Sequence, residues 1–319
     1  MKQNESSITS LISAFGRAYH CQYDTPLIFD DYIAKELINP QEFSDIRENM
    51  IQGIHFFNPE MAHQCKNDPD KILKWITQVQ ISPITLARAA YCEQVLLHEV
   101  ALGLKQVVIL GAGMDTFALR HPELEDTLEL FEVDYPATQQ FKRERLHQAK
   151  LNIPGNLHFV PMDFTREPSY ESLTNGGLEK LKTLVTLLGV SYYLTKENLS
   201  NLLRHVFSDL PTGSSIVLDY ADEHLFEEKG RFNRVENMVK MAAMGGEPMQ
   251  SCFTYEEMER LLADAGLLIY EHLSPEDIQD RYFSNRTDDL SAFETNHFIH
   301  AVKKIKTYSC CDYYRLGSE

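Results

Sequence analysis

The chain is short of cationic residues and of long apolar runs. Thirty Lys and Arg residues stand against 47 Asp and Glu residues, so the formal net charge is −17 over 319 residues. Binding nucleic acid independently of its sequence needs clustered Lys and Arg that face the phosphates. The acidic charge of this chain therefore disfavours a nucleic-acid partner. No run of about 18 apolar residues is present, and Met1 to Ser7 lacks the apolar segment of a signal peptide. We therefore expect a cytoplasmic protein without a membrane partner.

Cysteine is also sparse and scattered. The six cysteines contain no C-x-x-C pair; they are Cys21, Cys65, Cys92, Cys252, Cys310 and Cys311. This spacing indicates neither a zinc site nor a disulfide framework, so we predict no metal site. We interpret Cys310 and Cys311 as exposed thiols on a C-terminal tail.

Two phosphate-binding signatures are missing at the place where a nucleotide site would begin. No G-x-x-x-x-G-K-[ST] loop occurs, and the turn Leu110-Gly-Ala-Gly-Met-Asp-Thr116 has Thr116 where a dinucleotide fingerprint needs a third small residue beside the pyrophosphate. The turn follows the apolar run Val107 to Leu110, which is typical of a buried parallel strand. Asp134 ends the next such run about 20 residues later, where a carboxylate can accept both ribose hydroxyls. The pattern favours S-adenosylmethionine, a cofactor with a ribose but no phosphate, over NAD or a purely structural glycine turn.

The apolar pattern changes near residue 104. Before it, we predict helices, including one at 27–38 introduced by Asp24-Thr-Pro26 and a long one that begins at Ser82-Pro83 and ends at Gly103. After it, short apolar runs alternate with helical segments, which predicts βαβ units and a parallel sheet. The expected strands are 105–110, 128–133, 157–160, 183–188, 214–219, 267–272 and 297–302, with helices starting after Thr195 and Thr254 and an irregular segment at 274–296. We therefore divide the chain into a helical cap (1–103), a cofactor-binding core (104–305) and a tail (306–319).

Five motifs in this order resemble a known family. They are Leu110-Gly-Ala-Gly-Met-Asp-Thr116, Phe131-Glu-Val-Asp-Tyr-Pro-Ala-Thr-Gln139 with Lys142, Val160-Pro-Met-Asp-Phe164, Leu188-Gly-Val-Ser-Tyr-Tyr-Leu-Thr195 and Gly246-Glu-Pro248. They look like the leucine carboxyl methyltransferase-like group of class I S-adenosylmethionine-dependent methyltransferases, specifically its bacterial small-molecule O-methyltransferase branch. The resemblance runs from about Ser10 to Lys304. It implies an α/β, Rossmann-like fold: a seven-stranded, mostly parallel sheet with an antiparallel seventh strand and an N-terminal helical cap. Leu188 departs from the family, since many members have Glu there.

The expected cofactor site holds a ribose, an adenine and an amino-acid head. We predict that Asp134 binds the ribose hydroxyls. The alternative is that Asp134 only caps the helix that follows. The resemblance places an acidic contact to the adenine at Asp163 and a backbone contact at Phe164, although Asp163 could be a solvated turn residue. Arg88 lies in the apolar stretch Ile84 to Cys92, where a charge needs a partner, and can bind the cofactor carboxylate with two hydrogen bonds; Arg17 is second. The predicted set is Arg17, Arg88, Gly111, Ala112, Gly113, Asp134, Tyr135, Asp163, Phe164, Leu188 and Gly189.

The acceptor site is less defined. Tyr192 and Tyr193 follow the fourth expected strand, whose carboxyl end faces the ligand crevice, and an aromatic ring can attract a sulfonium; either could instead be a core residue. His20 is a candidate base for a phenol, with a surface position as the main alternative. A carboxylate acceptor, ionised at neutral pH, needs no base. The catalytic candidates are Tyr193, Tyr192 and His20, and the expected acceptor contacts are Tyr19, His20, Tyr23, Tyr192 and Glu247.

Together these expectations describe an S-adenosylmethionine-dependent O-methyltransferase. Its acceptor would be a hydroxyl or carboxylate of a small molecule, and the resemblance implies specialised metabolism. One alternative is carboxyl methylation of a protein C-terminus; another is a protein that binds S-adenosylmethionine without transferring its methyl group. We also expect residues 1 to about 80 to form a mobile lid, with hinges at Asn58-Pro59 and Lys66 to Pro69, because methyl transfer needs water excluded while ligands must still exchange.

Overall fold

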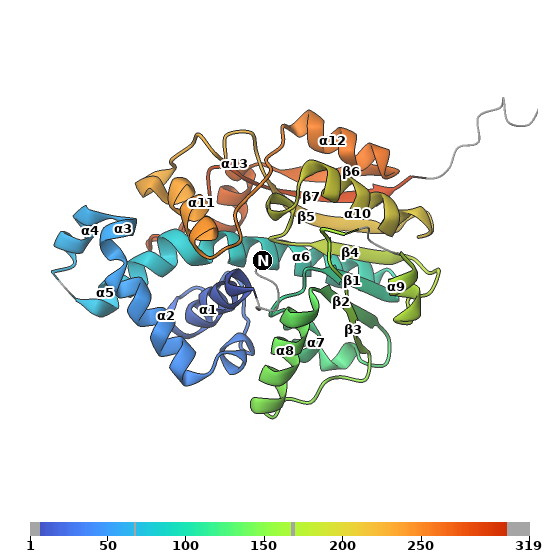
Figure 1. The fold of residues 1–319 in the computed structure, drawn as a ribbon, viewed down its shortest axis with the longest axis horizontal. Helices are drawn as coiled ribbons and strands as arrows, with labels where there is room; N and C mark the ends of the chain where they lie inside the picture. The colour runs from blue at the N-terminus through green and yellow to red at the C-terminus, as the bar shows by residue number, and fades with distance from the viewer. Residues whose placement is uncertain (1–6, 67, 167–169, 305–319) are drawn as a thin grey trace, which may run out of the picture.

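The computed structural model describes residues 7–66, 68–166 and 170–304. At its centre is a seven-stranded sheet with the order β3-β2-β1-β4-β5-β7-β6 (Figure 1). The strands are β1 (Gln106–Leu110), β2 (Glu129–Asp134), β3 (Leu157–Pro161), β4 (Thr183–Leu187), β5 (Ser215–Ala221), β6 (Leu267–Leu273) and β7 (Asn296–Lys303). Pairing among β1 to β5 is parallel, and β7 is antiparallel to both β5 and β6. The predicted fold class, including the antiparallel last strand, is confirmed.

Helices surround this sheet and also form a separate group at the N-terminal end (Figure 1). The α-helices are α1 (Ile8–Tyr23), α2 (Pro40–Gln52), α3 (Ile54–Phe57), α4 (Pro59–Gln64), α5 (Pro69–Ile76), α6 (Ser82–Ala101), α7 (Phe117–Arg120), α8 (Pro136–Gln148), α9 (Tyr170–Asn175), α10 (Lys196–Ser208), α11 (Arg234–Met244), α12 (Tyr255–Asp264) and α13 (Pro275–Ile278). Shorter 3-10 or π segments are η1 (Ala34–Leu37), η2 (Thr77–Ile81), η3 (Pro122–Leu124), η4 (Ser191–Tyr193), η5 (Arg231–Asn233) and η6 (Gln279–Phe283).

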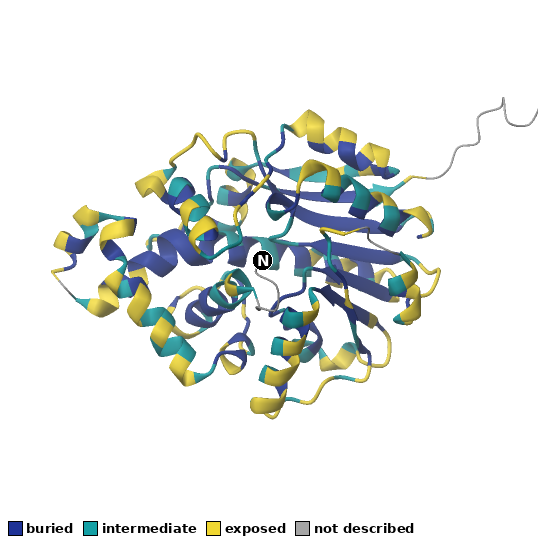
Figure 2. Ribbon diagram, in the orientation of Figure 1, coloured by how far each residue is buried: buried dark blue, intermediate teal, exposed yellow. Residues whose placement is uncertain are grey.

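Each face of the sheet carries its own apolar cluster. Val108 and Leu110 of β1 belong to a cluster with α10 and α12, whereas Val107 and Ile109 belong to a cluster with α6. Successive side chains of a strand point to opposite faces, so β1 is buried along its whole length, as the dark strands of Figure 2 show. Leu96 of α6 is in the same cluster as β1. The helix that ends the predicted cap therefore also forms a layer of the sheet unit.

Strand order reverses between β1 and β4, which places a crevice at their carboxyl ends. From β1 the chain proceeds outward to β2 and β3, then returns to the other side with β4 and β5. In open α/β sheets, ligands bind outside the carboxyl ends of strands at such a point. The segments that follow β1, β2 and β4 are therefore positioned to share one site.

The predicted helix starts after Thr195, after Thr254 and at Ser82 agree with the structure. Thr195 accepts a hydrogen bond from the backbone N–H of Asn198 at the start of α10, and Thr254 with Glu257 forms a capping box on α12. Such side chains satisfy backbone donors that have no partner within the helix. The long helix that begins at Ser82 is α6, and it ends two residues before Gly103.

The predicted helix at 27–38 is wrong. Residues 24–33 are irregular, and only η1 is helical in this stretch. The backbone N–H of Ile28 donates to Nε2 of His20 instead of to a helical carbonyl, and Asp31 accepts the N–H of Ala34. Tertiary partners thus replace the hydrogen bonds that a helix would make. The expected irregular segment at 274–296 contains two short helices, α13 and η6, before it becomes irregular.

The remaining organisational predictions have different outcomes. Asn58 and Asp68, in the expected hinges, are N-caps of α4 and α5. The predicted tail at 306–319, with Cys310 and Cys311, lies outside the described residues. Within the described part of the chain, no helix is long and apolar enough to cross a membrane, and no group of three or more metal-ligating side chains is found.

Candidate functional site

A cavity of about 420 Å³ lies at the carboxyl ends of β1, β2 and β4. Its walls come from the glycine turn after β1, the segments after β2, β3 and β4, the first turns of α1, the middle of α6 and the end of α11. All eleven predicted cofactor residues line this cavity: Arg17, Arg88, Gly111, Ala112, Gly113, Asp134, Tyr135, Asp163, Phe164, Leu188 and Gly189. The fold thus brings the separate sequence motifs to one place.

The glycine turn depends on two glycines. Gly111 and Gly113 have φ angles of +73° and +50°, a region that L-residues rarely adopt. A Cβ at Gly111 would lie 2.3 Å from Cγ2 of Val190, and a Cβ at Gly113 would lie 2.9 Å from Cβ of Ser10. The turn is therefore closed from both sides, by the loop after β4 and by α1.

Asp134 reaches from the end of β2 onto this turn. Its carboxylate accepts hydrogen bonds of 2.6 Å from the backbone N–H groups of Gly113 and Tyr135. Burial raises the pKa of Asp134 to about 6, against the lowering effect of these two bonds. No side chain caps the N-terminus of α8. The structure therefore disagrees with the alternative in which Asp134 is only a helix cap.

A buried ion pair supports the turn from behind. Nζ of Lys142 donates to Oε2 of Glu132 and to the backbone carbonyl of Asp115, both at 2.6 Å. Burial raises the pKa of Glu132 to about 7, although Lys142 opposes that shift. Lys142, which belongs to the second motif, thus ties α8 to the loop that follows the glycine turn.

Arg88 of α6 faces the loop after β4. Its Nη1 donates to Oη of Tyr192 at 3.0 Å and to Oδ2 of Asp219 at 3.4 Å. A Cβ at Gly189 would lie 2.5 Å from Nη1, so only glycine permits this approach. Burial opposes the charge of Arg88, but Tyr192 and Asp219 raise its pKa above the usual value, and it stays charged. Arg88, a charge in an apolar stretch of helix, therefore has the partners that we expected it to need.

Asp219 contacts two residues of the cavity lining, Arg88 and Gly189, and the sequence analysis did not single it out. It lies in β5, is fully buried, and its Oδ1 accepts the backbone N–H of Gly189 at 2.5 Å. It thereby fixes both Arg88 and the turn after β4. The available signal was a carboxylate inside the apolar run 215–221, because a buried charge needs partners.

Arg17 lies beside the glycine turn but is already bound to protein groups. It donates to Oδ2 of Asp31 at 2.7 Å, to Oγ of Ser13 at 3.1 Å and to the carbonyl of Met114 at 2.6 Å. Arg17 therefore stabilises the glycine turn through its hydrogen bond to Met114. Asp163 is both a lining residue and a turn residue, because its Oδ1 accepts the N–H and the hydroxyl of Thr165.

The acceptor prediction was wrong about which end of α1 faces the cavity. Tyr192, Tyr193 and Glu247 line it, whereas Tyr19, His20 and Tyr23 do not. Lining residues come instead from the start of α1: Ser7, Ile8, Thr9, Ser10, Ile12 and Ser13. Arg17 also lines the cavity, so distance along α1 is not the reason: Tyr19 packs in the apolar cluster of the cap and His20 binds Asp24 and Ile28, whereas Tyr23 is exposed.

His20 is buried rather than on the surface. Its Nδ1 is 2.7 Å from Oδ2 of Asp24, and its Nε2 accepts the N–H of Ile28 at 2.8 Å. Because the ring is fully buried and both nitrogens have partners, it does not offer a base to the cavity. Tyr19 packs between Phe15 and Tyr23 instead of lining the site.

Glu247 joins the loop after α11 to the start of α1. Its Oε2 accepts hydrogen bonds from Oγ1 of Thr9 at 2.5 Å and from Oγ of Ser7 at 3.2 Å. Next to it, burial and the charge of Glu247 raise the pKa of Tyr193 to about 12. Tyr193 therefore keeps its proton at neutral pH.

The cavity also has an apolar part that the sequence did not reveal. Met238, Met241 and Met249 line it, as does Ile84 of α6. Tyr192, Tyr193 and Met249 belong to one apolar cluster with the end of α11. We call Met238, Met241 and Met249 the methionine wall.

Comparison with known proteins identifies the family to which this cavity belongs. The family model described as leucine carboxyl methyltransferase matches residues 10–207. YktD of Bacillus subtilis (strain 168), by name an S-adenosyl-L-methionine-dependent methyltransferase, is 66% identical over 304 residues, 95% of this chain and 100% of YktD. The chain belongs to the leucine carboxyl methyltransferase family. The predicted family, methyltransferase activity and cofactor are thereby confirmed.

More distant relatives agree with this assignment. A Mycobacterium tuberculosis (strain H37Rv) protein, also an S-adenosyl-L-methionine-dependent methyltransferase by name, is 28% identical over 242 residues, 74% of this chain and 72% of its own length. A crystal structure of a DUF574 family protein from Streptomyces avermitilis covers 94% of this chain and 99% of its own, with a TM-score of 0.55 at 14% identity. The latter likeness concerns the fold alone.

The residues of this family member fit S-adenosylmethionine. The cofactor offers a diol, an aromatic base, a cationic sulfur and a carboxylate. The cavity supplies the Asp134 carboxylate for the diol, Asp163 and Phe164 for the base, the Tyr192 and Tyr193 rings for the sulfur, and the Arg88 guanidinium for the carboxylate. Each chemical group of the cofactor therefore has a complementary group in the lining.

Proposed function

We propose that this chain transfers the methyl group of S-adenosylmethionine to a carboxylate oxygen of a small molecule with an apolar body. The observation that carries this proposal is the position of Tyr192 and Tyr193. They line the same cavity as the glycine turn and also pack with Met238 and Met249 of the methionine wall. Tyr192 thus contacts both Arg88, in the part of the cavity that we assign to the cofactor, and the apolar cluster that contains Met249.

We call the part of the cavity lined by Arg88, Asp134 and Asp163 the cofactor half, and it binds and orients S-adenosylmethionine. Asp134 accepts the ribose hydroxyls, Asp163 faces the adenine and Arg88 binds the amino-acid carboxylate. When bound, S-adenosylmethionine supplies an electrophilic methyl group on a sulfonium sulfur. The protein's contribution is then alignment of the acceptor and exclusion of water, and alignment of this kind can supply roughly 7–11 kcal/mol. The start of α1 lines the same cavity and is joined to Glu247, and we propose that it excludes water when the ligands are bound.

A carboxylate acceptor is favoured over a hydroxyl. The predicted base, His20, has both ring nitrogens occupied, and Tyr193 has a pKa of about 12 and stays protonated. A carboxylate is already ionised at neutral pH, so its oxygen can attack without a base. The family description also refers to carboxyl methylation.

We favour a small molecule over a protein C-terminus because residues of α1 and the methionine wall line a cavity of only about 420 Å³. Methionine side chains are flexible and polarisable, so they adapt to apolar ligands of irregular shape. The resemblance to the bacterial small-molecule branch supports an acceptor from specialised metabolism.

The test uses the purified chain with methyl-labelled S-adenosylmethionine. Carboxylic acids with apolar bodies are compared with phenols of matched size and with a peptide that ends in leucine. A methyl ester releases labelled methanol in base, whereas a methyl ether does not. We expect base-labile label on the acids. Label only on phenols would refute carboxylate transfer, label only on the peptide would refute the small-molecule acceptor, and cofactor binding without transfer would indicate a non-transferring binder.

A further inference from the structure

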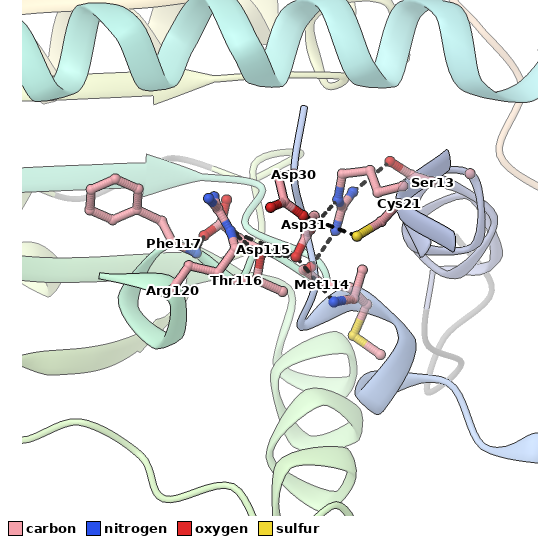
Figure 3. Close-up of polar contacts among 12 residues, drawn as sticks. Ser13, Cys21, Asp30, Asp31, Met114, Asp115, Thr116, Phe117 and Arg120 are labelled. Atoms are coloured by element: carbon pink, nitrogen blue, oxygen red, sulfur yellow. Dashed lines mark hydrogen bonds and ion pairs between the residues drawn. The ribbon is translucent and has the colours of Figure 1, made fainter. Parts of the chain in front are cut away.

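Asp31 is a fully buried carboxylate at the junction of the cap and the glycine turn. Its Oδ2 accepts from Nε of Arg17 at 2.7 Å, and its Oδ1 accepts from Oγ1 of Thr116 at 2.7 Å and from the N–H of Ala34 at 3.1 Å. Figure 3 shows Asp31 beside Thr116 and Met114. One side chain from the irregular segment 24–33 thus contacts both α1 and the loop after β1.

A second arginine completes the surroundings of Asp31. Nε of Arg120 donates to Oγ1 of Thr116 at 3.0 Å and lies 3.6 Å from Oδ1 of Asp31. Arg120 is itself held by Glu93 of α6 through Nη1 at 3.0 Å. Thr116 therefore donates to Asp31 and accepts from Arg120, so its hydroxyl has a defined orientation.

These contacts converge on the backbone of the glycine turn. Arg17, fixed by Asp31, donates to the carbonyl of Met114, and Thr116 is the residue from which α7 begins. Met114 and Thr116 are the first and third residues after Gly113, whose N–H is bound to Asp134. A buried carboxylate is costly unless its partners are well placed, so this arrangement resists alternative positions of the turn.

We propose that Asp31 is a positioning residue for cofactor binding, acting through Thr116 and Arg17 to hold the glycine turn in its binding conformation. The proposal rests on the cofactor site proposed above. It also gives Thr116 a role. The position that a dinucleotide site fills with a small residue carries here the hydroxyl that connects the turn to the cap.

Asp30 provides a matched control. It has the same side chain and the neighbouring position, but it is exposed, and its carboxylate accepts from Sγ of Cys21 at 3.0 Å (Figure 3). Asp30→Asn and Asp31→Asn therefore remove the same charge from the same segment, and only the second disturbs the contacts with the turn.

The experiment measures the affinity for S-adenosylhomocysteine and the melting temperature of each variant. We expect Asp31→Asn to weaken binding about tenfold or more at a temperature where the variant is fully folded, and Asp30→Asn to bind normally. Thr116→Val should weaken binding and Thr116→Ser should retain it, because serine keeps the hydroxyl. The Asp31→Asn and Thr116→Val effects should not add, as expected for residues in one network.

Equal affinities for Asp30→Asn and Asp31→Asn would refute the proposal. Should Asp31→Asn not fold, the Thr116 pair decides, and normal binding by Thr116→Val would refute it. Failure of the cofactor site itself is distinguishable, because Asp134→Ala would then bind as well as the unchanged chain.

Discussion

The backbone N–H of Gly113 donates to the carboxylate of Asp134 across 2.6 Å, joining the turn after β1 to the end of β2. The two residues lie 21 positions apart, and parallel pairing of β1 with β2 brings them together. A ribose placed against Asp134 would therefore also be next to the backbone of the glycine turn. This relationship makes Asp134 the most direct residue by which to test the cofactor site.

We expect Asp134→Ala to weaken S-adenosylmethionine binding by about 1.5–3 kcal/mol, the range for hydrogen bonds that involve a charged group. Calorimetry measures this loss directly. Asp126→Ala is the control, because Asp126 is an exposed turn residue away from the cavity. NAD should not bind, and unchanged affinity in a folded Asp134→Ala protein would remove Asp134 from the site.

Cofactor affinity should depend on pH. Burial raises the pKa of Asp134 to about 6, so the carboxylate that accepts the ribose hydroxyls is lost as pH falls through 6. Affinity for S-adenosylhomocysteine measured from pH 5 to 8 should fall on the acid side. Glu132 titrates nearby with a pKa of about 7, so the comparison is made with Asp134→Asn, which should lack the step due to Asp134.

The raised pKa of Asp134 affects the stability of the ligand-free protein in the opposite direction: low pH favours the folded state. The folded pKa of Asp134 is above the ordinary value of 3.8, so the stabilising contribution is present at low pH and is lost as pH rises through about 6. Denaturant unfolding should therefore give Asp134→Asn a relative gain in stability above pH 6. A gain that is independent of pH would contradict this assignment.

Arg88→Lys should lose at least about tenfold in cofactor affinity, because an ammonium cannot make the two parallel hydrogen bonds of a guanidinium. Titration calorimetry on the folded variant measures this. Arg231→Lys is the matched control, since Arg231 forms an exposed ion pair with Asp289 outside the cavity. Normal binding by Arg88→Lys would mean that another residue holds the carboxylate, with Arg17 next to be tested.

The start of α1 should open and close over the cavity. Hydrogen exchange at residues 8–13 is expected to slow when S-adenosylhomocysteine is added, rather than at Arg17 to Tyr23. Thr9→Val, which removes the hydroxyl bound to Glu247, should accelerate that exchange and raise the acceptor KM. Deletion of residues 1–23 is a poorer test because it removes Phe15 from the buried core.

Exchange that is identical with and without ligand would instead make α1 a fixed layer. Ser44→Val serves as a control for Thr9→Val, since Ser44 contacts Glu48 on α2 away from the cavity. It should leave exchange at residues 8–13 unchanged.

Local patterns in the sequence determined the sheet and much of the cofactor half of the cavity. Apolar runs of four to six residues, the glycines of the turn and the capping side chains at Thr195 and Thr254 act over short stretches of chain. The motifs therefore predicted the strands, and residues at or just after the ends of β1, β2, β3 and β4 line one cavity because parallel strands end at the same edge of the sheet.

Only the tertiary structure showed which residues of the helical cap contact the core and which residues line the part of the cavity that we assign to the acceptor. Asp31 and Thr116 are 85 residues apart, and Arg88 and Asp219 are 131 residues apart, so no local pattern pairs them. His20 could be assigned to the surface or to the site until its partners Asp24 and Ile28 were known. A buried polar side chain is specified by the donors and acceptors that surround it, and the chain supplies these only when it has folded.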